Sequence, residues 1–211
     1  ETTVTLITKP LPQKNEAEAI NALSRKRGNK LLKVGFVYAK TPETSGWTYS
    51  HEQGRRHVMS ILGNLVETFS IEDVPQNQES YHDIRRLADS KLDIIFTTSP
   101  TYNMQTLKAA LEYPKVKFFN CSQNDSFRNV RTFYGRIYEV KFLMGLIAGA
   151  MTKNDIIGYV ATYPISEVIS AINAFALGVA LVNPHAKVRV YWAYRWEHQP
   201  FSVLPATELT K

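Results

Sequence analysis

The stretch that decides the fold is LLKVGFVYAKTPETSGWTYSHEQGRRHVMSILGN, residues 31–64. Its apolar run Leu31–Ala39 predicts a buried strand, and the amphipathic stretch Tyr49–Leu62 predicts a helix that Gly63 and Asn64 end. A strand followed by a helix is the repeating unit of parallel sheets. We therefore expect strands and helices to alternate along the rest of the chain.

The alternation continues downstream of this stretch. Further strands are expected at Leu65–Asp73, Leu92–Thr98, Val116–Ser122, Ile156–Thr162 and Lys187–Tyr194, and further helices at Gln78–Ser90, Tyr102–Tyr113, Ile137–Thr152 and Ser166–Val182. The strands are almost continuously apolar, as expected where helices cover both faces of a sheet. The sequence therefore predicts an α/β fold whose parallel strands are joined by right-handed crossovers.

Composition and cysteine content narrow the class of protein. The 211 residues are 44% hydrophobic and 21% charged, which excludes a disordered chain. A single cysteine, Cys121, allows neither an internal disulfide nor a cysteine zinc site, and its place at the end of an apolar run predicts a buried structural thiol. Because no apolar run approaches the roughly 20 residues of a membrane helix, we expect no membrane span.

Positive charge is concentrated near the start of the chain. The formal net charge is +6, and residues 1–33 hold seven Lys and Arg against three Glu, which accounts for +4 of it. A basic arm, residues 1–31, beside a nearly neutral body is typical of a solvated leader, whereas nucleic-acid binding needs a continuous basic face. We expect no nucleic-acid partner, and an anionic membrane surface is the alternative contact for the arm.

The loops after the predicted strands lack the motifs of catalysis and cofactor binding. In α/β sheets ligands bind beyond the carboxyl ends of the strands, and here these loops are rich in aromatic, hydroxyl and amide side chains. The chain contains no GxGxxG, GxxxxGKS, GxxxxGKT or GxSxG motif, and His51 and His57 are six residues apart instead of the four of a helical metal pair. The missing motifs therefore disfavour an enzyme, and we expect no cofactor or metal ion.

The segment GWTYSHEQGR, residues 46–55, resembles the GWTY-x-H-x-QGR segment of the basic membrane protein (BMP) family, the substrate-binding proteins of ABC-type nucleoside importers. Further matches follow in family order at Asp93–Ser99, Tyr113–Phe118, Asn129–Val130, Tyr134–Glu139, Leu143–Lys153, Ile157–Ala161, Asn173–Gly178 and Val182–Pro184. The resemblance covers about residues 33–196. The chain is similar to the branch of the family that carries GWTY.

This family has the type I periplasmic-binding-protein fold, in which two α/β lobes with helix-covered parallel sheets enclose a ligand cleft. The resemblance implies that residues 32–128 form lobe one, residues 129–136 form a hinge crossover, and residues 137–211 begin lobe two. Only two strands are predicted in lobe two, whereas a full lobe has several more. We expect this lobe to be incomplete, with the chain truncated, processed, or completed by a second copy in a dimer or swapped assembly.

The resemblance also implies a function. Family members are extracytoplasmic solute-binding proteins that capture purine nucleosides or bases and deliver them to an ABC-type permease, and the GWTY branch favours a free base such as adenine. Two alternatives stay open. One is a ligand-sensing regulatory domain of the same fold, and the other is a small purine-converting α/β enzyme.

The aromatic residues near the predicted strand ends suit a purine, which is a flat ring system with polar edges. We expect Trp47 of lobe one and Trp196 of lobe two to sandwich the base, because stacking contributes roughly 1–3 kcal/mol per base. The other expected ligand contacts are Tyr49, Ser99, Tyr102 and Asn124 in lobe one, and Tyr163 and Asn173 in lobe two. His51 is expected to order its loop through a hydrogen bond to the backbone.

Overall fold

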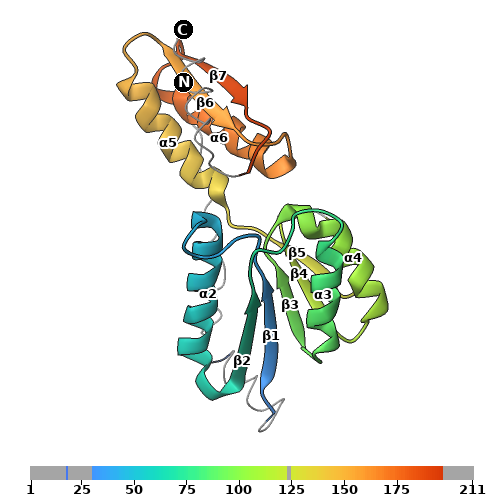
Figure 1. The fold of residues 1–211 in the computed structure, drawn as a ribbon. Helices are drawn as coiled ribbons and strands as arrows, with labels where there is room; N and C mark the ends of the chain where they lie inside the picture. The colour runs from blue at the N-terminus through green and yellow to red at the C-terminus, as the bar shows by residue number, and fades with distance from the viewer. Residues whose placement is uncertain (1–17, 19–29, 123–124, 197–211) are drawn as a thin grey trace.

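The chain folds into two lobes, one above the other, in a computed structural model that describes residue 18 and residues 30–122 and 125–196 (Figure 1). Lobe one extends to Phe133 and lobe two begins at Ile137. A short connection, residues 134–136, joins them.

Lobe one is built on a five-stranded parallel sheet with the strand order β2-β1-β3-β4-β5. Its strands are β1 (Leu32–Val37), β2 (Val66–Ile71), β3 (Ile94–Thr97), β4 (Lys117–Cys121) and β5 (Val130–Phe133). The carboxyl ends of these strands point toward lobe two (Figure 1). The chain runs from β1 outward to β2 and returns to β3 on the other side of β1, which creates the topological switch point where α/β sheets bind ligands.

Helices cover both faces of this sheet, which confirms the predicted layers. On one face α2 (Gly46–Leu62) packs against β1 and β2 through Val34, Phe36, Val58, Leu62 and Val66. On the other face α3 (Ser80–Asp89) and α4 (Asn103–Glu112) cover a cluster that contains Ile84, Leu87, Ile95, Ala109 and Phe118. Two short 3-10 helices, η1 (Gly63–Leu65) and η2 (Pro100–Tyr102), follow α2 and β3.

Helix α2 begins three residues earlier than the sequence pattern predicts. The Oγ of Ser45 accepts a hydrogen bond from the backbone N–H of Thr48 at 3.3 Å and so caps the helix. Gly63, with φ 45°, ends it. The early start places Trp47 in the first turn of α2 instead of on the preceding loop, so the helix fixes the backbone of this residue.

Strand β5 lies within residues 129–136, which we expected to form only a crossover. Its residues pair in parallel with β4, with Phe118 opposite Val130 and Cys121 opposite Phe133. The amide of Asn129 anchors the start of the strand, because its Nδ2 donates to the carbonyl oxygen of Val116 at 2.7 Å. The segment that connects the last strand of this sheet to the next helix, α5 (Ile137–Met151), is therefore residues 134–136.

Lobe two contains α5 (Ile137–Met151), β6 (Ile156–Ala161), α6 (Ser166–Val182) and β7 (Lys187–Trp192). Strands β6 and β7 pair in parallel. Within the described residues this lobe has two strands against five in lobe one, as expected of an incomplete lobe. None of the described helices is both long enough and apolar enough to cross a membrane.

Helices α5 and α6 approach each other closely at glycines. A Cβ atom added to Gly145 would lie 2.1 Å from the carbonyl oxygen of Phe175, and one added to Gly178 would lie 2.2 Å from that of Phe142. No side chain larger than hydrogen fits these positions without moving a backbone. The glycines within the matched segments Leu143–Lys153 and Asn173–Gly178 are thus required for packing in lobe two.

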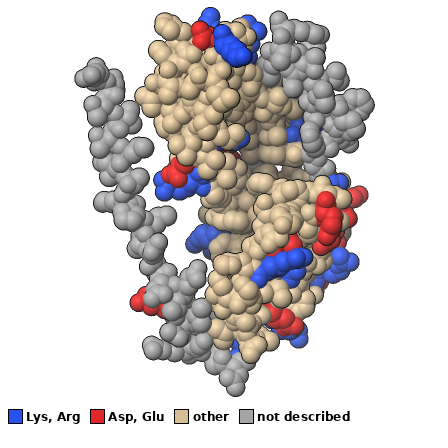
Figure 2. Space-filling model, turned by 90° about the vertical axis from the view of Figure 1, so that its left-hand side faces the viewer, with Lys and Arg blue, Asp and Glu red and all other residues tan. Residues whose placement is uncertain are grey.

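The side of lobe two on which α5 lies is nearly free of charged side chains in Figure 2. The exposed residues of α5 include Val140, Leu143, Ile147 and Met151, which recur at helical spacing. In the same view, positive and negative side chains are mixed on lobe one. Large exposed apolar surfaces are rare on soluble monomers, so this surface agrees with the incomplete second lobe.

Candidate functional site

A pocket of about 120 Å³ lies between the two lobes. This volume is below the roughly 300–1,000 Å³ of sites for drug-sized ligands. The pocket is beyond the carboxyl ends of the strands of lobe one, as expected for an α/β sheet. It is lined by Ala39, Ser45, Trp47, Gln76, Ser99, Pro100, Ser122, Tyr134, Ile165, Val168 and Trp196.

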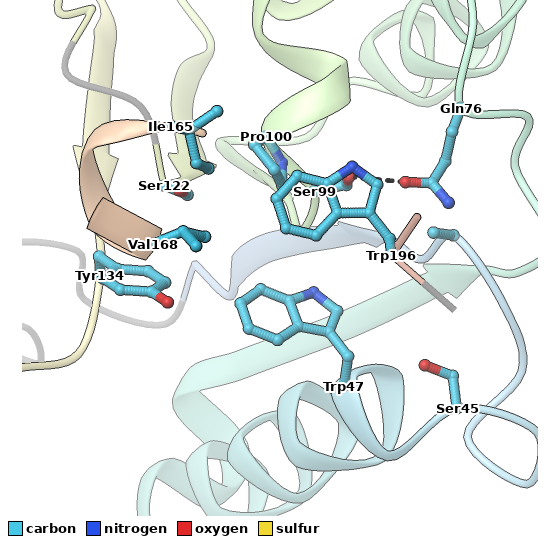
Figure 3. A pocket seen from close by; sticks show the side chains of 11 residues that line it. Ser45, Trp47, Gln76, Ser99, Pro100, Ser122, Tyr134, Ile165, Val168 and Trp196 are labelled. Carbon is cyan, nitrogen blue, oxygen red and sulfur yellow. Dashed lines mark hydrogen bonds between the residues drawn. The ribbon is translucent and has the colours of Figure 1, made fainter. Parts of the chain in front are cut away.

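Aromatic rings from both lobes form the walls of the pocket. Trp47 comes from the first turn of α2, and Trp196 follows β7 in lobe two. Figure 3 shows the two indole rings across the pocket from each other. The ring of Tyr134 lies 6.4 Å from that of Trp47, and the ring of Tyr163 lies 5.0 Å from that of Trp196, centroid to centroid. Each indole is therefore supported by a tyrosine.

The orientation of Trp47 is fixed by contacts outside the pocket. Its Nε1 donates a hydrogen bond to the carbonyl oxygen of Thr98 at 2.6 Å. The imidazole of His51 packs at an angle of 68° to the indole, 5.1 Å away, and also contacts the ring of Phe133. Burial lowers the pKa of His51 to about 4. The expected backbone hydrogen bond of His51 is replaced by these ring contacts, which hold Trp47.

The polar residues Ser99 and Gln76 of the pocket belong to a hydrogen-bonded group at the carboxyl ends of β2, β3 and β4. The Oγ of Ser99 donates to the Oε1 of Gln76 at 3.0 Å, and the Oγ1 of Thr101 donates to the same oxygen at 3.2 Å. The Nδ2 of Asn120 donates to the carbonyl oxygen of Ser99 and to the Oγ1 of Thr97, both at 3.0 Å. None of the described residues that line the pocket is charged, so the lining suits a neutral ligand.

Three of the predicted site residues, Trp47, Ser99 and Trp196, line the pocket. A fourth, Tyr163, contacts Trp196 from behind the lining. Asn124 lies outside the described residues.

The structure does not bring the other three predicted residues to the pocket. Tyr102 belongs to the core of lobe one, where its hydroxyl donates to the carbonyl oxygen of Val74 at 2.7 Å. Tyr49 is 52% exposed on α2, and Asn173 is exposed in the middle of α6. Neither lines the pocket, because a residue two positions after Trp47 turns away from it on a helix. Asn173 is five residues beyond Val168, the last pocket residue of α6.

Several lining residues were not predicted from the sequence. Gln76 comes from the loop after β2, and Tyr134 from the connection after β5. Ser122, at the end of β4, adopts the left-handed φ of 67°, which is uncommon for a serine. Tyr134 begins the matched segment Tyr134–Glu139, which was the one available signal for it.

The structure gives no sign of a metal site or a reactive thiol in its described part. No group of three or more His, Cys, Asp or Glu side chains within those residues could hold a metal ion. Cys121 is buried and free, as predicted. Burial, and to a smaller extent the charge of Glu167, raises the pKa of its thiol to about 12, so the thiol stays protonated.

Two known proteins are similar in sequence to most of this chain. A protein of Brucella abortus named as a purine-binding protein is 39% identical over 165 residues, which are 78% of this chain and 47% of that protein. A protein of Haloferax volcanii with the provisional name of an ABC transporter glucose-binding protein is 32% identical over 169 residues, which are 80% of this chain and 43% of that protein. The chain thus spans about half the length of these relatives.

The fold is also that of solved solute-binding proteins. The ABC transporter solute-binding protein of Aeropyrum pernix K1 gives a TM-score of 0.67 at 18% identity, over 85% of this chain and 52% of that one. Such proteins bind ligands and are not enzymes. The family described as ABC transporter substrate-binding protein PnrA-like, or Bmp, matches residues 31–211. The chain therefore belongs to the Bmp family of ABC transporter substrate-binding proteins.

Proposed function

We propose that the chain captures a purine, with a free base favoured over a nucleoside, and delivers it outside the cytoplasm to an ABC-type permease. One observation carries this proposal. Indole rings from two different lobes, Trp47 and Trp196, face each other across one pocket (Figure 3). A flat ligand held between them contacts both lobes at once, so binding favours the closed arrangement.

The chemistry of the pocket supports a flat heterocycle. Stacking on an aromatic ring contributes roughly 1–3 kcal/mol per base. The hydroxyl and amide groups of Ser99 and Gln76 lie at the same pocket and suit polar edges. The name of the Brucella abortus relative points to the same ligand class.

A sugar is the second candidate ligand. The name of the Haloferax volcanii relative refers to glucose, and aromatic side chains also pack against the apolar faces of sugars. Both candidates describe capture of a neutral solute, so they differ in the ligand and not in the type of protein.

Calorimetric titration separates these candidates. The chain is unfolded and refolded to remove any bound molecule, and the released molecule is identified by mass spectrometry. The refolded chain is then titrated with adenine, adenosine and D-glucose, with tryptophan fluorescence recorded in parallel. We expect adenine to bind most tightly and to quench the fluorescence. Binding of glucose with no binding of either purine would overturn the proposal.

A further inference from the structure

A buried carboxylate oxygen without a hydrogen-bond donor lies next to the pocket. It is the Oε2 of Glu167, in the first turn of α6. Among the described residues, the only other buried side-chain oxygen or nitrogen without a partner is the Oγ1 of Thr48. Buried polar atoms are nearly always paired in folded proteins, and an unpaired charged group is the least favourable exception. Such an atom therefore needs an explanation.

Glu167 lies close to the ligand pocket but is not among the residues that line it. Its neighbours Ile165 and Val168 both line the pocket, on the side that lobe two contributes. In Figure 3 they lie beside Ser122 and Tyr134, which come from lobe one. The charge of Glu167 also contributes, after burial, to raising the pKa of the Cys121 thiol and of the Tyr134 hydroxyl. The carboxylate is thus close to the junction of the two lobes.

Among the described residues, the one acidic residue that is buried as a whole, Glu52, has donors. The carboxylate of Glu52 accepts hydrogen bonds from Tyr38, Arg55 and Arg56. Glu167 has no comparable group of donors. Glutamate has several staggered rotamers about its first two side-chain torsions, so a change of rotamer, without displacement of α6, can turn the carboxylate toward the pocket.

We infer that Glu167 is a specificity-determining residue of lobe two, whose carboxylate accepts a hydrogen bond from an N–H of the purine base held between Trp47 and Trp196. This inference rests on the proposed function and adds a residue to it. An ionised carboxylate only accepts hydrogen bonds. It selects ligands with an N–H at the edge that faces lobe two, and it disfavours analogues that present only acceptors or methyl groups there.

The test compares Glu167 variants with a set of adenine analogues. The chain and its variants Glu167→Gln and Glu167→Ala are titrated with adenine, 9-methyladenine and N6,N6-dimethyladenine. Glu43→Gln serves as the matched control, because Glu43 is exposed and does not line the pocket. Thermal unfolding of each variant establishes that it is folded, and Glu167→Gln, which keeps the shape of the side chain, carries the comparison if the alanine variant is unstable.

The expected result is a loss of affinity whose size depends on which ligand is titrated. Glu167→Ala lowers the affinity for adenine about 10- to 100-fold, as expected for a hydrogen bond to a charged group, and Glu167→Gln lowers it several-fold. For the analogue that lacks the recognised N–H, the same substitutions have little effect. If Glu167 had only a structural role, its substitution would weaken the binding of all three ligands equally.

The outcomes that overturn the inference differ from those that overturn the proposed function. If the unaltered chain binds no purine, the proposed function is wrong and the inference falls with it. If the unaltered chain binds adenine and the Glu167 variants bind it equally well, the inference alone is wrong. If the Glu167 variants lose the same amount of affinity for all three ligands, the inference alone is also wrong.

Discussion

The indole Nε1 of Trp47 donates a 2.6 Å hydrogen bond to the carbonyl oxygen of Thr98, which joins the first turn of α2 to the carboxyl end of β3. Together with the edge contact from His51, this bond holds the ring in one orientation. A ring that is already oriented loses little conformational freedom when a ligand stacks on it. Trp47 therefore provides a preorganised stacking surface on the lobe-one side of the pocket.

The first prediction concerns this hydrogen bond. Trp47→Phe keeps an aromatic ring but removes the donor, so the carbonyl oxygen of Thr98 loses its partner. We expect the free energy of unfolding to fall by about 1 kcal/mol, and the affinity for adenine to fall about 10-fold through the smaller and less fixed ring. Urea unfolding and calorimetry measure the two effects. An unchanged affinity would show that the orientation of this ring is irrelevant to binding.

A second prediction concerns the buried carboxylate of Glu52, which is 3% exposed and pairs with Arg55 at 2.8 Å. Glu52→Gln leaves the guanidinium of Arg55 without its charge partner, and we expect a loss of about 3 kcal/mol in the free energy of unfolding. Arg56→Gln is the matched control, since the Arg56 side chain is 65% exposed and its removal should change stability by less than about 1 kcal/mol. Equal losses in both variants would argue against a buried pair.

The pH dependence of stability is a third test. Burial lowers the pKa of His51 from 6.5 to about 4, so the unfolded chain binds the proton more readily. The neutral His51 therefore makes its full contribution to the stability of the fold above pH 6.5, and this contribution is lost as the pH falls toward 4. The pKa of Glu52 is lowered from 4.5 to about 2, mainly by its hydrogen bond with Arg55, so its own contribution is lost only below pH 4.5. In His51→Phe, the melting temperature should vary less between pH 6.5 and 4.5 than in the unaltered chain. Identical profiles would contradict this assignment.

A fourth prediction uses the contact between α5 and α6. Gly178→Ala places a methyl group 2.2 Å from the carbonyl oxygen of Phe142, so the helices must separate. We expect a loss of about 1–3 kcal/mol in the free energy of unfolding. Gly54→Ala is the control, because nothing lies within 4 Å of its added Cβ in the middle of α2. That change should stabilise the chain by about 0.5–1 kcal/mol. If Gly178→Ala had the same free energy of unfolding as the unaltered chain, the helices would not be in close contact.

Much of the fold could be predicted because its signals are local. The helix Ser166–Val182 has the predicted bounds, since its apolar periodicity and the Asn183-Pro184 stop lie within the segment itself. Strand β5 could not be predicted in this way. Its four residues, Val130–Phe133, include Arg131 and show no long apolar run. They form a strand because β4 offers an open edge, which is a property of the folded sheet.

The site could be predicted only in part for a related reason. Trp47, Ser99 and Trp196 follow strands and reach the pocket. Tyr102 also follows a strand, but the 3-10 helix η2 turns its ring into the core. There its hydroxyl donates a hydrogen bond to the carbonyl oxygen of Val74. The inclusion of Gln76 depends on β2 lying next to β1, which the order of residues alone does not reveal.

The central claim is that the two indole rings hold a purine between the lobes. Calorimetric titration of adenine into the double variant Trp47→Ala, Trp196→Ala tests it most directly, with Tyr49→Ala as the control for loss of an exposed aromatic ring that does not line the pocket. The account predicts at least about a 30-fold loss of affinity in the double variant and no change in the control. Undiminished affinity in a folded double variant would contradict it.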